Sequence, residues 1–272
     1  LARHFSAVQT LEEFTLILQK LNGIFSVIIS KENFTAAAID TTRIYPVFYS
    51  YSKGKWQVTD NPYSLITNES SILPSALEQM RSSFAPLQGK TLVEGILQVK
   101  PCTAIEFLSA GETQTSIYFH YNINEGQVCK ASKSQVLSAL ESAVKRLVKR
   151  ASGKQIVVPM SAGYDSRIIL CLLKEQGYKN VITYTIGSND SASEVSVASK
   201  VACALGYAHY PIDLTKVGDE LDFSDFNDYV MHLGALTNFS WLGEYASVKC
   251  LQAKGVLEKN AIFCVSICGF LS

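Results

Sequence analysis

The stretch Ile156-Val-Val-Pro-Met-Ser-Ala-Gly-Tyr-Asp-Ser166, followed by Val181-Ile-Thr-Tyr-Thr-Ile186, decides the fold of the second half of the chain. Its first five residues, Ile156–Met160, form a short apolar run typical of a buried parallel strand. Arg167–Gln176 has helical spacing and ends at Gly177, a residue favoured just past helix C-termini. The run ending at Ile186 is a second strand. A strand, a helix and another strand at this spacing predict a parallel sheet.

The same alternation continues downstream. Ser191-Ala-Ser-Glu194 has the form of a capping box that opens a further helix, and the apolar face of that helix is Val195, Ala198, Val201, Ala202 and Leu205. We expect a third strand over Tyr207–Ile212, a mostly helical region from Asp222 to Lys254, and a buried strand within Ala261–Val265. The predicted fold of this half is therefore α/β, with a doubly wound parallel sheet.

Upstream of this sheet, apolar residues at helical spacing predict a helix over Ser134–Arg150, with Ser134 as its N-cap. The basic residues in its last turns are interpreted as solvated cations near a helix C-terminus, with phosphate binding as the alternative. The polar segment Asn122–Lys133 is the expected linker. We place a first domain over residues 1–125 and a second over residues 126–272.

The first domain alternates strand-length runs rich in aromatic and β-branched residues with turn signals. These runs, over residues 24–29, 34–39, 47–51 and 55–59, predict an antiparallel meander. A helix over Pro74–Ser83 and strands around Thr103–Leu108 and Thr115–His120 are expected to follow. The first domain is thus predicted to be antiparallel, β-rich and of the α+β class.

Composition restricts the partners. The chain has 272 residues, 47% of them hydrophobic and 18% charged, as expected for folded domains. Its 24 basic and 24 acidic residues give a formal net charge of zero, which predicts no nucleic-acid partner. Ala261–Leu271 is the longest nearly apolar stretch and is too short to span a bilayer. Because the start also lacks a signal-peptide pattern, we expect a cytoplasmic protein with no membrane partner.

The seven cysteines are scattered. Cys171 and Cys203 lie inside apolar helical patterns and are interpreted as small buried hydrophobic residues in a reducing compartment. Cys264-x-x-x-Cys268 has no second pair of cysteines or histidines at ligand spacing, so we predict no metal site there. The four histidines are isolated in the sequence and are assigned no catalytic part.

Ser161-Ala-Gly-Tyr-Asp-Ser166 lies where a predicted parallel strand ends and a helix begins, a place that offers unpaired N–H groups to an anion. Gly163 lets the backbone approach a phosphate closely, and Ser161 and Ser166 add hydroxyl donors. A carboxylate at Asp165 would repel phosphates unless a cation lay between them, so we predict that it binds Mg²⁺. We therefore expect the loop to hold the pyrophosphate end of ATP. The alternative is that Asp165 or Ser166 caps the helix and Gly163 only makes the turn.

This loop resembles the Ser-Gly-Gly-x-Asp-Ser loop of the ATP pyrophosphatase (PP-loop) superfamily, with Ala162 in place of one glycine; that change is mild if Ala162 has a negative φ. Within the superfamily the chain is similar to the asparagine synthetase family over nearly its whole length. Segments similar to the end of that family's glutamine amidotransferase domain, and to the stretch that bridges to its synthetase domain, are Leu21–Ile28, Asp40–Tyr49, Trp56–Asp60, Thr91–Ile96 and Tyr118–Tyr121.

The resemblance implies a carbon–nitrogen ligase that uses ATP and Mg²⁺ to adenylate a small-molecule carboxylate, aspartate or a related acid. Glutamine or ammonia would supply the nitrogen, and a homodimer is one arrangement that the resemblance allows. By the same resemblance, the pyrophosphate and Mg²⁺ would be held by Ser161, Gly163, Asp165 and Ser166. Pro159 and Ile186 would lie beside the adenosine, mainly through their backbone.

Asp40 matches the family's aspartate that holds the amino group of glutamine; its alternative role is to end a strand before a turn. The chain starts at Leu1 and its first cysteine is Cys102, so the family's N-terminal nucleophilic cysteine is missing. We therefore expect no glutamine hydrolysis by these residues and assign no catalytic residue. Asn260–Ser272 stands where the family has a Gly-rich loop with a second metal-binding aspartate, and here Gly269 is followed directly by Phe270.

Two functions stay open at this point. One is an ATP-dependent amide-forming ligase of asparagine-synthetase type, and the other is a catalytically inactive nucleotide-binding or structural homologue. A PP-loop enzyme acting on tRNA is disfavoured by the neutral charge.

Overall fold

The computed structural model describes residues 2–120, 131–187, 194–215, 222–234, 236–238 and 241–264. Several sequence-based predictions lie wholly or partly outside these ranges, among them the linker from Asn122 onward, the cap at Ser191, the helical region Asp222–Lys254, and the segment from Val265 to Ser272. The chain divides into two compact units, Leu1–Gln127 with Asn227–Ser240, and Val128–Phe226 with Trp241–Ser272.

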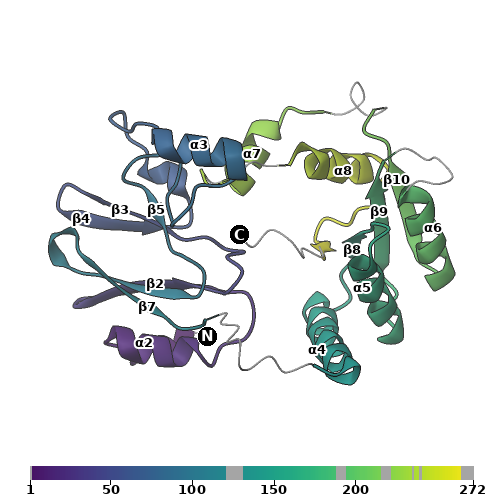
Figure 1. Ribbon diagram of the computed structural model, residues 1–272, viewed down its shortest axis with the longest axis horizontal. Coiled ribbons are helices and arrows are strands. Elements are labelled where there is room, and N and C mark those ends of the chain that lie inside the picture. Colours follow the sequence, from purple (N-terminus) through teal and green to yellow (C-terminus); the bar gives the residue numbers. More distant parts are fainter. Residues whose placement is uncertain are drawn as a thin grey trace. The chain divides into compact units, whose positions relative to one another are not determined.

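The first unit contains a four-stranded antiparallel sheet in the order β1-β2-β6-β7. Its strands are β1 (Ser26–Lys31), β2 (Phe34–Ile39), β6 (Thr103–Phe107) and β7 (Thr113–Ile117). Helices α1 (Ala2–Phe5) and α2 (Leu11–Leu18) pack on one face, where Phe14 and Leu18 are fully buried (Figure 1). Because successive side chains of a strand point to opposite faces, Ala36 and Ala38 of β2 lie on this face, and Ala37 and Ile39 lie on the other.

A second antiparallel sheet, in the order β4-β3-β5, covers the other face. It consists of β3 (Phe48–Ser52), β4 (Lys55–Thr59) and β5 (Leu97–Gln98). The predicted meander is therefore wrong, because its four strands form two hairpins that lie in different sheets. The reason is the connection over residues 40–47, which is long enough to cross between sheets, whereas Lys53-Gly54, both at positive φ, closes a two-residue hairpin.

Short helical segments complete the first unit: η1 (Pro62–Leu65), α3 (Pro74–Ser83), η2 (Ser109–Gly111) and α7 (Phe226–Gly234). The later part of the chain joins this unit through backbone and side-chain contacts. Leu92 N donates to Leu236 O over 2.9 Å, and the Arg43 guanidinium lies 3.4 Å from Thr237 Oγ1. The sequence pattern did not predict this return of residues 227–240 to the first unit.

The second unit contains a parallel sheet in the order β10-β9-β8-β11. Its strands are β8 (Ile156–Pro159), β9 (Val181–Ile186), β10 (Ala208–Ile212) and β11 (Ile262–Phe263). The chain moves from β8 to β9 to β10 in one direction and then returns to the far side of β8. The topological switch point of the sheet therefore lies between β8 and β11.

Helices cover both faces of this sheet (Figure 1). Ile156 and Val158 pack against α4 (Lys133–Ala151), α5 (Tyr164–Glu175) and α6 (Glu194–Leu205). Val157 points to the opposite face, toward Cys250 and Leu251 of α8 (Leu242–Ala253). The mixed α/β class, with antiparallel sheets in one unit and a parallel sheet in the other, is confirmed. Among the described residues, no helix has the length and apolar character needed to cross a bilayer.

Three local predictions in this unit are wrong. Helix α4 is capped by Ser132 rather than Ser134: Ser132 Oγ accepts from Gln135 N, and Gln135 Oε1 accepts from Ser132 N. Helix α5 begins at Tyr164 instead of Arg167, because the polar residues of its first turn look like loop in the sequence. Cys171 and Cys203 are exposed, since each lies off the helix face that carries the buried residues.

Candidate functional site

The loop after β8 lies at the carboxyl end of the strand, beside the switch point, where sheets of this type bind ligands. Its first residue is fixed to the neighbouring strand by two bonds. Met160 N donates to Tyr184 O over 2.7 Å, and the buried Thr185 hydroxyl donates to Met160 O over 2.7 Å. The sheet therefore sets the position from which the loop starts.

The two predicted serines meet inside the loop. Ser161 N donates to Ser166 Oγ over 3.2 Å, and the two hydroxyl oxygens are 3.4 Å apart. Gly163 N donates in turn to Ser161 Oγ over 3.1 Å. Ser166 is only 1% exposed, so its hydroxyl closes the loop from within. Its predicted contact with pyrophosphate stays a prediction.

Gly163 is the N-cap residue of α5, with φ −70° and ψ 160°, and among the described residues no side chain caps the helix. The interpretation of Asp165 or Ser166 as the helix cap is therefore wrong. The φ of Gly163 is one that any residue can adopt, so the backbone conformation does not require glycine at this position. A larger residue would instead be disfavoured by crowding, because its Cβ would lie 3.0 Å from Ser161 Oγ. Ala162 is not among the residues at positive φ, so its side chain is accommodated without strain.

The first turn of α5 faces solvent. Gly163, Tyr164 and Asp165 are all exposed. Within the part of the chain that the structure describes, no hydrogen bond is formed by the backbone N–H groups of Tyr164 and Asp165, as expected for uncapped helix starts. These amides, together with the positive end of the helix dipole, can receive an anion.

The Asp165 carboxylate projects from this same turn. Among the described residues it has no ion pair or hydrogen bond, and no group of three or more His, Cys, Asp or Glu side chains could hold a metal. A Mg²⁺ ion at Asp165 would therefore need phosphate oxygens and water for the rest of its shell, which is how Mg²⁺ binds in nucleotide sites. The exposed carboxylate and open amides fit that requirement.

Two further residues contact the loop and were not predicted. The Glu194 carboxylate, at the first turn of α6, accepts a hydrogen bond from Ala162 N over 2.9 Å. Arg167 donates from Nη2 to Ala162 O over 2.8 Å and from Nε to Gly163 O over 2.9 Å. Arg167 directly follows the loop motif, which was the available signal, whereas the contact of Glu194 depends on tertiary structure.

Pro159 and Ile186 lie on neighbouring strands near their carboxyl ends. Pro159 pairs with Tyr184, two residues before Ile186. By strand alternation both share the face of Val157, opposite to α5, and both are partly buried. They therefore share one face next to the switch point, and their contact with adenosine stays a prediction.

Asp40 lies in the first unit and is 1% exposed. Its Oδ2 accepts from Phe25 N over 3.1 Å, and its Oδ1 accepts from the backbone and the hydroxyl of Thr42, each over 2.6 Å. These bonds tie the end of β2 to the segment before β1 and to the following turn. The binding of glutamine by Asp40 stays a prediction.

Burial affects two groups near Asp40. It raises the pKa of the Tyr118 hydroxyl, with the Cys102 thiol and the Asp40 carboxylate adding to the shift. It also raises the pKa of Cys102, again with a smaller contribution from Asp40. Both groups therefore stay neutral at physiological pH. Tyr118 OH donates to Ile39 O over 2.6 Å, so this side chain also holds β2 in place.

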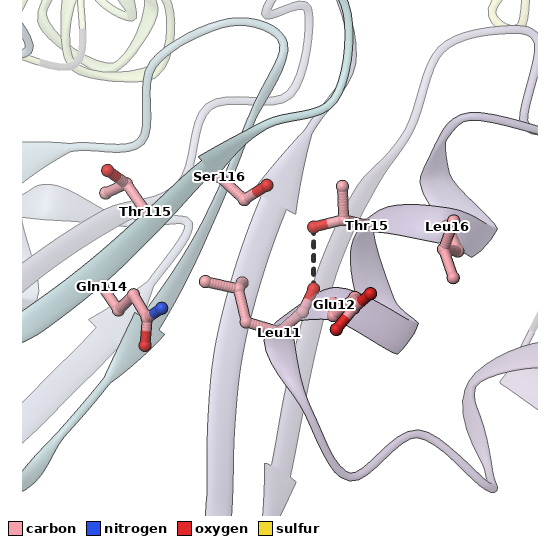
Figure 2. A pocket seen from close by; sticks show the side chains of 7 residues that line it. All are labelled: Leu11, Glu12, Thr15, Leu16, Gln114, Thr115 and Ser116. Atoms are coloured by element: carbon pink, nitrogen blue, oxygen red, sulfur yellow. Dashed lines mark hydrogen bonds between the residues drawn. The ribbon is translucent and has the colours of Figure 1, made fainter.

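Cavities open on the first unit within the described part of the chain, and two of them are well defined. One, of about 270 Å³, lies between α2 and β7 (Figure 2). Glu12 is one of the residues that line it, and the Thr15 hydroxyl donates to Leu11 O over 2.7 Å. The other, of about 400 Å³, is lined by residues that include Lys20, Asn22 and Tyr118. The candidate site residues predicted from the sequence line neither cavity.

Residues 135–238 match the family described as asparagine synthase. Over 85 residues the chain is 35% identical to the tRNA-specific 2-thiouridylase MnmA of Anaplasma marginale (strain St. Maries). That match covers 27% of this chain and 22% of the relative, so the chain spans about a fifth of its length. Both matches support a domain of the PP-loop ATP pyrophosphatase type.

Likeness to solved structures is weak. An NH3-dependent NAD synthetase from Campylobacter jejuni is 14% identical with a TM-score of 0.28, over 44% of this chain and 54% of the other. The glutamine phosphoribosylpyrophosphate amidotransferase from B. subtilis is 12% identical with a TM-score of 0.28, over 96% of this chain and 52% of the other. Likenesses at this level say nothing about the activity of this chain.

Proposed function

We propose that the second unit binds Mg-ATP at the start of α5 and activates a carboxylate by adenylation, as an amide-forming ligase of asparagine-synthetase type. The observation that carries the proposal is the uncapped first turn of α5 at the carboxyl end of β8, where the amides of Tyr164 and Asp165 have no hydrogen-bond partner among the residues that the structure describes. A pyrophosphate group with Mg²⁺ is an anion that suits an uncapped helix start with an exposed carboxylate in its first turn.

In this proposal the loop residues bind and orient the triphosphate, and Asp165 holds the metal. Mg²⁺ would supply charge neutralisation of the phosphate oxygens. An oxygen of the substrate carboxylate attacks the α-phosphorus, forming an O–P bond as the bond to the β-phosphate breaks and pyrophosphate leaves. Ammonia then attacks the activated carbonyl, loses a proton and displaces AMP. Positioning and electrostatics accomplish most of this, so no acid–base pair is required.

Calorimetry with Mg-ATP tests the binding step. We expect Asp165→Asn to weaken binding about tenfold or more, because it removes the metal ligand. Glu175→Gln is the matched control, since it changes the same charge at the far end of α5, about 15 Å away. Chelation of Mg²⁺ should reduce wild type to the affinity of Asp165→Asn. Equal binding of Mg-ATP by wild type and both variants would mean that the loop has a structural role only and does not bind the nucleotide through Asp165.

Exchange of labelled pyrophosphate into ATP tests the chemical step. We expect exchange that depends on one acid in a panel of aspartate and other small carboxylates, with ammonia or glutamine as the nitrogen donor in the complete reaction. Absence of exchange with every acid would refute adenylation by this chain.

A second candidate is a nucleotide-binding homologue without catalysis. The hydrogen bond from Ala162 N to Glu194 favours it, because a protein carboxylate occupies a loop amide that an anion would otherwise use. Tight binding of Mg-ATP without exchange would support this candidate over the ligase.

Small molecules are the partners that we propose. The relative named for its action on tRNA shares 85 aligned residues with this chain, but the formal net charge of zero disfavours a polyanion partner. A gel-shift assay with tRNA at moderate salt tests this, and a shift at protein concentrations near those used for Mg-ATP would contradict the proposal.

A further inference from the structure

Arg167 is held against the loop by three contacts. Nη2 donates to Ala162 O over 2.8 Å, Nε donates to Gly163 O over 2.9 Å, and the guanidinium carbon lies 4.4 Å from the centre of the Tyr164 ring. One planar fork therefore donates from two nitrogens to two consecutive carbonyl groups, whereas a lysine offers a single nitrogen on a flexible stem in place of this rigid fork. The stacked ring limits the rotation of the guanidinium.

Fixing these two carbonyls also fixes the next two amides. In a trans peptide the C=O of one residue and the N–H of the next point in opposite directions; among the described residues there is no cis peptide bond. Because Ala162 O and Gly163 O point to Arg167, the N–H groups of Gly163 and Tyr164 point away from it. Gly163 N–H meets Ser161 Oγ over 3.1 Å, and Tyr164 N–H is one of the open amides at the exposed start of α5.

We propose that Arg167 is a positioning residue for nucleotide binding, holding the carbonyls of Ala162 and Gly163 so that the Tyr164 amide faces the phosphates. This inference rests on the proposed function of the loop. Arg167 acts through the backbone: two of its donors are engaged by carbonyl oxygens on the side opposite to the amides. Its role is therefore one of geometry, and its positive charge alone does not replace it.

The test compares Arg167→Lys and Arg167→Ala with the matched variants Arg146→Lys and Arg146→Ala, whose side chain is exposed on α4 in the same unit. Mg-ATP affinity is measured by calorimetry, and thermal unfolding is followed for each variant. Arg167→Ala is also titrated in the presence of millimolar guanidinium or, at matched ionic strength, ammonium. Arg167→Lys keeps the charge and the aliphatic stem, so it provides a folded variant should Arg167→Ala unfold.

We expect both Arg167 variants to bind Mg-ATP about tenfold or more weakly, the scale set by a lost pair of charge-assisted hydrogen bonds. The Arg146 variants should bind like wild type. Guanidinium, but not ammonium, should restore part of the affinity of Arg167→Ala, a response that general destabilisation of the fold would not give. Wild-type affinity in Arg167→Lys, or equal rescue by both cations, would overturn the inference.

The same measurements separate the positioning role of Arg167 from nucleotide binding by the loop. If wild type binds Mg-ATP and Arg167→Lys binds it equally well, the positioning role is refuted and the proposed function stands. If wild type binds no Mg-ATP, the proposed function is refuted and this inference with it.

Discussion

Asp40 offers a test of whether a buried carboxylate supports the first unit. Its side chain is 1% exposed and accepts hydrogen bonds from Phe25 N, Thr42 N and the Thr42 hydroxyl. Asp40→Ala would remove the acceptor of two partly buried backbone N–H groups, those of Phe25 and Thr42, at about 0.5–1.5 kcal/mol each because water can partly replace the lost bonds. The expected loss is therefore about 1–3 kcal/mol, a sizeable share of the ~5–15 kcal/mol that stabilises a typical domain. Asp40→Asn keeps one acceptor oxygen and should cost roughly half as much.

Urea unfolding followed by tryptophan fluorescence measures this loss. The chain has two tryptophans, and Trp56 packs in the first unit against Tyr49 and Phe107. In a Trp241→Phe background the signal therefore reports the first unit. Asp60→Ala, an exposed aspartate of the same unit, is the control and should change stability by less than about 0.5 kcal/mol. A loss below about 1 kcal/mol for Asp40→Ala would refute the structural role and favour a binding role instead.

Three further predictions follow from individual contacts. Ser166→Ala removes the acceptor of Ser161 N and should destabilise the second unit by about 1–3 kcal/mol in urea unfolding, while the exposed Ser142→Ala should be near neutral. The raised pKa of Tyr118 means that its contribution to stability is full below the unfolded value of 10.0 and is lost as pH rises above it. Unfolding midpoints across that range should fall in wild type and fall less in Tyr118→Phe; identical slopes would contradict this. Ser132→Ala should cost about 1 kcal/mol through its cap, and a larger loss in Ser134→Ala would contradict the observed N-terminus of α4.

Local sequence signals predicted local structure well. The residues predicted for β2, β4, β9 and α3 are those found, because each run has strong β-branched or aromatic content, or begins with a proline at the first helical turn. The division of strands between the two sheets of the first unit was missed. Strand β2 pairs with β6 and β3 pairs with β5, and such pairings depend on packing between segments far apart in the chain.

The candidate site shows the same limit. The position of the loop at the end of β8 followed from strand-and-helix alternation, and the meeting of Ser161 with Ser166 agrees with their shared motif. The contact of Glu194 with Ala162 N could not be read from the sequence, because it joins residues 32 positions apart. Arg167 could have been considered, since i to i+4 spacing on a helix brings its side chain back toward Gly163.

The most direct test of the loop is a crystal of the chain grown with, or soaked in, Mg-ATP. The proposal predicts a phosphate oxygen within about 2.7–3.2 Å of the Tyr164 or Asp165 amide nitrogen, with a cation between that phosphate and the Asp165 carboxylate. Nucleotide bound elsewhere, with Glu194 still on Ala162 N and the start of α5 facing only water, would contradict it.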